Sequence, residues 1–119
     1  MIKNTVILVL LFGQMTSCVQ KTSEKTVVYI LSLPNIDNVK SVVIRGSDKP
    51  LSWQSDYEMK KNESNLTYRA VVTYLTGYKF TEVKFVVNNE FELPNLNNRR
   101  IAFSNSDTTT YMATFNVKK

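Results

Sequence analysis

From Thr26 onward, hydrophobic side chains recur at every second position, and this alternation constrains the fold more than any other feature of the sequence. A period of two is typical of a β-strand with one buried face, and no segment has the 3.6-residue period of an amphipathic helix. We therefore expect an all-β domain. The alternating positions are Val27, Tyr29, Leu31 and Leu33; Tyr68, Ala70, Val72 and Tyr74; Val83, Phe85 and Val87; and Tyr111, Ala113, Phe115 and Val117.

Turn-forming residues divide the chain into short strands. Pro34-Asn35 is expected to end the first strand, and a β-branched run over 39–45 stops at Gly46 before the turn-forming residues 47–50. Shorter strands are expected near 57–59 and over 90–93. About seven short strands in roughly 100 residues predict a single antiparallel β-sandwich of the immunoglobulin-like type, spanning residues 26–119.

The first 25 residues have a different character. Lys3 precedes an apolar run over 5–12, which is far shorter than the ~20 residues that cross a bilayer, so residues 1–17 are expected to be a signal peptide. Met15-Thr16-Ser17-Cys18 resembles the lipobox of bacterial lipoproteins, which implies acylation of Cys18 and anchoring in a membrane. Residues 18–25 would then be the lipidated cysteine and a flexible tether. The alternative is that Cys18 is an incidental residue beside an ordinary cleavage site.

The composition argues against several classes of function. The sequence has no histidine and one cysteine, which leaves no Ser-His-Asp triad, no thiol nucleophile beyond Cys18 and no Cys/His metal site. The carboxylate pairs Asp56/Glu58 and Glu90/Glu92 are expected to face solvent. The net charge of +5 is scattered along the chain, Lys84 and Arg99 included, and does not predict nucleic-acid binding. We expect no enzyme activity, no metal and no cofactor.

The stretch EVKFVVNNEFELPNLNNRR, residues 82–100, predicts a hairpin with a functional face. A two-residue turn at Asn88-Asn89 would put the core-facing residues on one side and an aromatic ring beside a lysine on the other. Such a surface suits sugars, because a ring stacks on their C–H face while ammonium and amide groups bond their hydroxyls. In the alternative, Phe91 tucks under the loop 94–98 and Lys84 is merely solvated. The outward side holds Lys84, Val86, Phe91 and Leu93.

Short motifs between residues 42 and 99 resemble the starch- and glycogen-binding modules grouped as carbohydrate-binding module families 20 and 48, and the related amino-terminal domains of some bacterial esterases and lipoproteins. The motifs are the strand 41–47 leading to Gly46, the turn 50–53, the strand Val83-Lys84-Phe85, an aromatic residue at Phe91, and the loop 97–99. The sequence departs from the family where Val83 replaces an aromatic residue and Phe91 replaces a tryptophan.

The resemblance implies a carbohydrate site and leaves two functions open. One is a lipid-anchored, noncatalytic protein that binds an α-glucan or related polysaccharide in the cell envelope, near a transporter or hydrolase. The other is an envelope lipoprotein that uses the same sandwich to bind a protein partner. Trp53 would face sugar in the first, or cover the edge of the core. Val19-Gln20 lacks the aspartate of inner-membrane retention, which favours the outer membrane. The implied carbohydrate-binding residues are Trp53, Lys84, Phe91, and Asn97 or Asn98.

Overall fold

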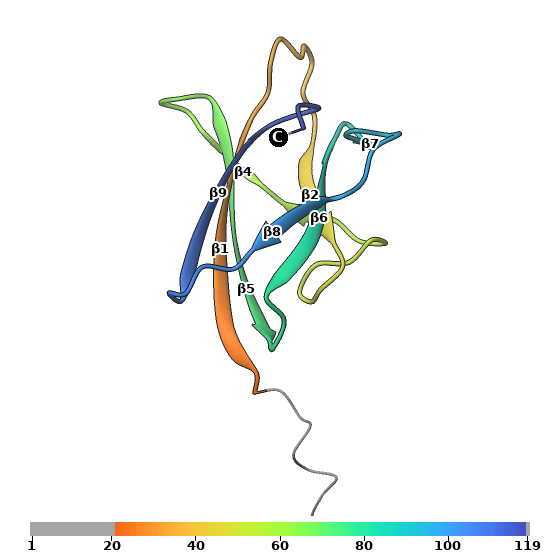
Figure 1. Cartoon of the computed structure of the whole chain (residues 1–119). Coiled ribbons are helices and arrows are strands. Elements are labelled where there is room, and N and C mark those ends of the chain that lie inside the picture. The colour runs from red at the N-terminus through yellow and green to blue at the C-terminus, as the bar shows by residue number, and fades with distance from the viewer. Residues whose placement is uncertain (1–20, 119) are drawn as a thin grey trace, which may run out of the picture.

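The computed structural model describes residues 21–118, which form strands and no helix, and which include no helix that could cross a membrane. Two sheets lie face to face around one core (Figure 1), so the all-β sandwich expected from the alternation is confirmed. The strands are β1 (Ser23–Ser32), β2 (Val42–Gly46), β3 (Tyr57–Glu58), β4 (Lys60–Asn62), β5 (Thr67–Thr76), β6 (Phe80–Val87), β7 (Glu90–Phe91), β8 (Arg99–Ala102) and β9 (Thr108–Thr114).

Sheet A has the strand order β4-β5-β1-β9. β1 pairs antiparallel with β5 along its whole length, with Tyr29 opposite Ala70. On its other side β1 pairs with β9 in parallel, with Thr26 opposite Thr108. The expectation of antiparallel pairing therefore holds throughout the two sheets except at this pair of strands.

Sheet B has the order β3-β2-β6, and β6 carries two further partners on its far edge. β7 pairs with the last residues of β6, and β8 pairs with the first, so that Phe91 lies opposite Val86 and Arg99 opposite Val83. β7 and β8 therefore lie end to end along the same edge, and residues 92–98 fill the gap between them. This gap positions the site described below.

The core lies between the sheets, and most of the residues predicted from the alternation occupy it. Val27, Leu31, Val72, Val83 and further predicted positions have exposed fractions of 5% or less. They come from both sheets, so the inward faces of β1, β5 and β6 bury one another. This burial is the main stabilising contribution to the fold.

One polar contact bridges neighbouring strands inside the core. The hydroxyls of Tyr29 and Tyr74 lie 2.7 Å apart and share a hydrogen bond. The Tyr29 ring also packs edge-on against Phe85 of the opposite sheet, with ring centroids 6.2 Å apart. Burial raises the pKa of Tyr29, and burial raises the pKa of Tyr74 to about 12.

The strand boundaries differ from the sequence-based expectation at several places: among them, β2 begins at Val42 and not at residue 39, and β7 ends at Phe91 and not at residue 93. β1 begins at Ser23, because residues 23–25 pair with the end of β5, so the predicted tether over 18–25 is wrong for its last three residues. The short polar strands β4 and β8 were not predicted, and β9 ends at Thr114, before the exposed Val117. The predicted signal peptide 1–17 and Cys18 lie outside the described residues.

The β6–β7 hairpin confirms the turn read from the sequence. Asn88 and Asn89 have φ angles of 51° and 66°, the left-handed values that a two-residue hairpin of this type requires. The Asn88 side-chain oxygen accepts hydrogen bonds from the backbone N–H groups of Lys40 and Ser41, at 2.7 and 3.2 Å. The turn is therefore fastened to the loop before β2.

Candidate functional site

The candidate site lies on the outer face of sheet B. Arg45 of β2 lies directly opposite Lys84 of β6, and Val86 of β6 lies opposite Phe91 of β7. Because the core takes the alternate positions of these strands, all four side chains leave the sheet on the side away from the core. The sequence predicted this face for three of them and overlooked Arg45.

Three residues gather around the Arg45 guanidinium, and we name the set of four the Arg45 cluster: Arg45, Trp53, Asp56 and Phe91. The guanidinium carbon lies 5.4 Å from the centroid of the Phe91 ring. Nη1 of Arg45 donates to the Trp53 carbonyl at 2.8 Å, while Nε and Nη2 donate to Asp56 Oδ1 at 3.0 and 2.7 Å. These bonds fix the guanidinium beside an aromatic ring.

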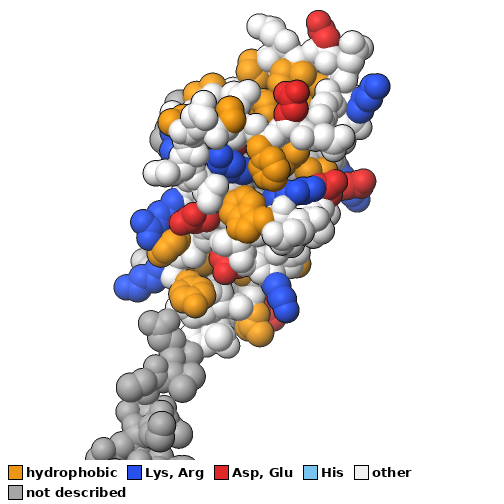
Figure 2. Space-filling view, turned by 90° about the vertical axis from the view of Figure 1, so that its right-hand side faces the viewer, with side chains coloured by type: hydrophobic (Ala, Val, Ile, Leu, Met, Phe, Trp, Pro, Cys, Tyr) orange, Lys and Arg blue, Asp and Glu red, His pale blue; other side chains and the backbone are white. Residues whose placement is uncertain are grey.

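The Arg45 cluster is accessible from solvent. Phe91 is 41% exposed and Trp53 is half-buried. Figure 2 looks onto this side of the molecule, where hydrophobic side chains alternate with basic and acidic ones in the middle of the face. Arginine has five N–H donors, of which three are used here, so two remain, and Asp56 Oδ2 accepts no hydrogen bond from the described residues. A ring, two free donors and a free acceptor are the groups that a polyhydroxylated ligand needs.

Lys84 does not take the role that the family resemblance implies. It is only 8% exposed, and its ammonium donates to the carbonyls of Leu93 and Leu96 at 2.8 and 3.1 Å. Both sequence-based readings of Lys84, facing sugar and merely solvated, are therefore wrong. Val86 and Leu93 are also buried, so Phe91 is the exposed member of the predicted hairpin face.

The loop between β7 and β8 is held by its carbonyl groups. Lys84 holds it near its start, and Lys118 donates to the carbonyls of Asn97 and Asn98 at 3.2 and 3.0 Å. Leu93 has φ = 48°, a left-handed conformation that is costly for a bulky residue. Its N–H donates to the Asn116 side chain at 2.8 Å, which fixes this strained position. The loop is therefore ordered before any ligand binds.

The two asparagines predicted as sugar ligands lie on this loop and differ in their contacts. Asn97 is exposed, whereas the Asn98 amide donates to Glu82 Oε1 at 3.1 Å and is half-buried. The two main-chain carbonyls that Lys118 holds orient both residues. The structure thus brings the Phe91 ring and the main-chain carbonyl of Trp53 together through Arg45, and it places Asn97 and Asn98 further along the same face.

Directly behind this face lies a buried ion pair that the sequence analysis placed at the surface. Glu92 is fully buried, although the pair Glu90/Glu92 was expected to face solvent, and Arg99 is 3% exposed. Arg99 Nε and Nη2 donate to the two Glu92 carboxylate oxygens at 2.7 and 2.8 Å. The Phe85 N–H also donates to Glu92 Oε2, at 3.0 Å. The carboxylate thereby accepts a backbone hydrogen bond from β6 in the gap between β7 and β8, where no strand pairs with β6.

Arg99 connects this gap to the end of the chain. Its guanidinium also donates to the Tyr111 hydroxyl and to the carbonyls of Thr114 and Val117, at 3.2, 2.9 and 2.9 Å. Burial lowers the pKa of Arg99, but its hydrogen bonds to Glu92 and Tyr111 raise it further than burial lowers it, and the net pKa is raised. The Arg99–Glu92 pair therefore stabilises the contact between the loop 92–98 and residues 114–117.

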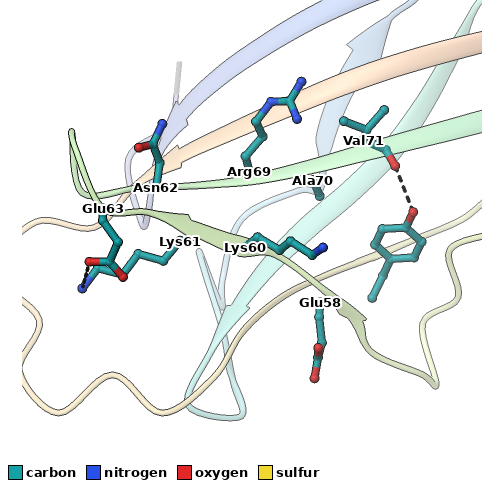
Figure 3. Close-up of a pocket in the computed structure, with 9 residues that line it drawn as sticks. Glu58, Lys60, Lys61, Asn62, Glu63, Arg69, Ala70 and Val71 are labelled. Carbon is teal, nitrogen blue, oxygen red and sulfur yellow. Dashed lines mark hydrogen bonds and ion pairs between the residues drawn. The ribbon is translucent and has the colours of Figure 1, made fainter.

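A second hollow, shown in Figure 3, lies between β3 and β5 at the edge of the sandwich. Lys60 and Arg69 lie opposite each other on neighbouring strands, yet in Figure 3 their side chains extend in different directions. The Tyr57 hydroxyl is already bonded to the Val71 carbonyl at 2.9 Å. Basic side chains line this hollow, but no aromatic ring in it is free to stack on a ligand. It is therefore a weaker candidate than the Arg45 cluster.

Within residues 21–118, no group of three or more acidic or cysteine side chains is arranged to hold a metal ion. Neither a protein-family model nor a curated protein sequence matches the chain.

The sequence analysis missed Arg45 and Asp56 as site residues. Arg45 could have been found from the register, since it occupies the strand position that faces Lys84.

Proposed function

We propose that this chain is a noncatalytic, lipid-anchored protein of the cell envelope that binds an α-glucan or related polysaccharide at the Arg45 cluster. The observation that carries the proposal is an exposed Phe91 ring beside a guanidinium that is already fixed by Trp53 and Asp56. The ring stacks on the apolar C–H face of a sugar. The free guanidinium donors and Asp56 Oδ2 bond its hydroxyls.

The fixed geometry supports affinity as well as specificity. Arg45 is held by three hydrogen bonds, and the neighbouring loop is held by Lys84 and Lys118. A ligand would therefore order few side chains on binding, and each ordered side chain would otherwise cost about 0.5–1.5 kcal/mol. Arg45 takes the part in this site that the resemblance gives to Lys84.

The position of the cluster fits an anchor at Cys18. The described chain enters β1 at one end of the sandwich, whereas the β6–β7 hairpin that carries Phe91 lies towards the other end (Figure 1). A lipid on Cys18 would hold the first end near a bilayer. The hairpin would then point away from that bilayer, towards polymers and towards a transporter or hydrolase that handles them.

A protein partner is the second candidate, and exposed apolar side chains on the outer face of sheet A favour it. Met112 is 73% exposed and Val71 is 41% exposed. They project from β9 and β5, which lie on either side of β1, and both point away from the core, where they offer a contact surface that a sugar would not use. This candidate predicts that Met112→Asp disrupts binding of the protein partner, whereas substitutions in the Arg45 cluster leave that binding unchanged.

Titration of tryptophan fluorescence tests the glycan proposal directly, because Trp53 is the only tryptophan and lies in the cluster. The full chain in mild detergent is titrated with glycogen, amylopectin and unrelated polysaccharides. We expect quenching or enhancement by the glucans, which Phe91→Ala abolishes and Arg45→Lys shifts to higher glucan concentration. The matched controls Met112→Ala and Arg69→Lys, which lie outside the cluster, should bind as the unaltered chain does. A folded chain that responds to no polysaccharide would overturn the proposal.

A further inference from the structure

The outer face of sheet B carries a second arginine stacked on a phenylalanine. The Arg100 guanidinium carbon lies 3.5 Å from the centroid of the Phe80 ring. Phe80 is on β6 and Arg100 is on β8, and both side chains point away from the core. Phe80 is 36% exposed, Arg100 is exposed, and Arg100 forms no ion pair with any described residue. We name this pair the Arg100 stack.

The Arg100 stack and the Arg45 cluster lie along one strand. Phe91 is opposite Val86, and Phe80 begins the same strand six residues earlier. At about 3.3 Å per residue, the two aromatic rings are roughly 20 Å apart along β6. Since positions 80, 82, 84 and 86 share one side of the strand, both rings face the same direction.

A polar groove adjoins Arg100, where the loop after β7 runs beside β6. It is open to solvent, and its wall combines amides with charged groups. Lys118 and the Asn98–Glu82 hydrogen bond brace it, so it does not depend on a ligand to keep its shape. The residues that line it are Glu82, Leu96, Asn97, Asn98, Arg100 and Lys118.

We propose that the Arg45 cluster, this groove and the Arg100 stack form one continuous site for an internal stretch of an extended polysaccharide. An aromatic ring with its guanidinium holds the polymer at each end, and Asn97 with its neighbours bonds the hydroxyls between. This inference rests on the proposed function and specifies its substrate class: a linear run of several sugar units, and not a single sugar or a chain end.

Calorimetric titration of the full chain in detergent with linear α-glucan oligosaccharides of increasing length tests the inference. We expect affinity to rise with length until the oligosaccharide spans the roughly 20 Å between the rings, and then to level off. Phe80→Ala and Arg100→Lys should weaken binding of long oligosaccharides by about 5-fold, the loss expected of one aromatic contact, and leave the shortest that bind unaffected. Leu66→Ala, an exposed apolar residue at the β4–β5 turn, is the matched control.

The outcomes separate this inference from the proposal on which it rests. If Phe91→Ala abolishes binding while Phe80→Ala and Arg100→Lys leave long and short oligosaccharides unchanged, the continuous site is overturned and the proposed function stands. If affinity is independent of length, the continuous site is likewise overturned. If the unaltered chain binds no oligosaccharide and no polymer, the proposed function fails and takes the inference with it. Thermal unfolding of each variant verifies that it is folded.

Discussion

Sheet B contains two arginine–carboxylate pairs of the same length and opposite character. In both pairs the shortest contact is 2.7 Å. The Arg99 and Glu92 side chains are 2% and 0% exposed, whereas those of Arg45 and Asp56 are 24% and 49% exposed. The contact distance alone would suggest the same role for both pairs. Their different burial suggests different roles.

The difference lies in how many polar groups are left free. Arg99 and Glu92 share their hydrogen bonds with the backbone of β6, β9 and residues 116–117, so the pair is saturated in the sense that each of its side-chain nitrogen and oxygen atoms has a partner. Arg45 keeps two donors and Asp56 keeps one oxygen. A saturated pair holds a fold together, and an unsaturated pair beside a ring is suited to binding.

Removing the buried carboxylate should have the largest effect. Glu92→Gln leaves the Arg99 guanidinium buried without its counter-charge, and we expect the free energy of unfolding to fall by about 3–5 kcal/mol. Urea unfolding followed by circular dichroism measures this change. The matched control is Glu90→Gln, two residues away and exposed, which should change stability by less than about 0.5 kcal/mol. Equal effects of the two substitutions would contradict the comparison.

An apolar replacement of the whole pair sharpens the same point. Buried ion pairs are often replaced by apolar residues without loss. Here the double variant Glu92→Leu/Arg99→Leu would also orphan the N–H groups of Phe85 and Asn116 and the Val117 carbonyl. We therefore expect it to remain less stable than the unaltered chain, and recovery of full stability would show that the backbone bonds contribute little.

The Tyr29–Tyr74 pair extends the comparison to buried polar groups without charge. Below pH 10 both hydroxyls keep their protons in the folded and unfolded chains. Above it, tyrosines ionise in the unfolded chain, while Tyr74, with its pKa raised to about 12, stays protonated in the fold. Stability should thus fall between pH 10 and 12, by an amount on the order of 2 kcal/mol from Tyr74 and by a further amount from Tyr29, whose pKa is also raised. Urea midpoints across this range measure it; Tyr74→Phe should flatten the slope, whereas Tyr78→Phe, at an exposed position, should not.

Lys84 stands between the two pairs, because it is buried yet adjoins the binding face. Lys84→Met keeps the apolar stem and removes the hydrogen bonds to the Leu93 and Leu96 carbonyls. We expect a loss of about 1–2 kcal/mol in the free energy of unfolding, together with faster amide hydrogen exchange in the loop 93–98. A loss of glucan binding with unchanged stability and exchange would instead give Lys84 the direct role that the family resemblance implies.

The smallest effect on stability is expected at the exposed pair. Arg45→Lys removes the planar fork that reaches both Asp56 and Trp53, but exposed ion pairs contribute only about 0–1 kcal/mol. We expect thermal unfolding to be almost unchanged while glucan binding falls at least about tenfold, the equivalent of one charged hydrogen bond. A destabilisation as large as that of Glu92→Gln would remove the distinction between the two pairs.

The sequence predicts those parts of the fold that a two-residue period encodes. The inward faces of β1, β5 and β6 follow from that period, and the Asn88-Asn89 turn sets the register that places Phe91 opposite Val86. The burial of Glu92 and Lys84 could not be read this way. Their partners are Arg99 and two loop carbonyls, which meet them only after the chain has left β7 and returned as β8.

The residues of the candidate site also differ in whether the sequence reveals them. Phe91 and Trp53 are visible as aromatic residues in turns and hairpins, and the family resemblance points to both. Arg45 and Asp56 look like ordinary surface charges until the loop after β2 brings the Asp56 carboxylate back to the guanidinium. Side chains that face a ligand are thus partly visible from local pattern, while those that orient them depend on tertiary contacts.

The parallel pairing of β1 with β9 sets the order in which the sandwich can be completed. β1 lies inside sheet A, and one of its two neighbours is the last strand of the chain. Until β9 has been synthesised, one whole edge of β1 has no hydrogen-bonding partner, so sheet A cannot close on a growing chain. Contacts between segments so distant in sequence also slow folding. β1 therefore acquires its final environment only when β9 is available to pair with it.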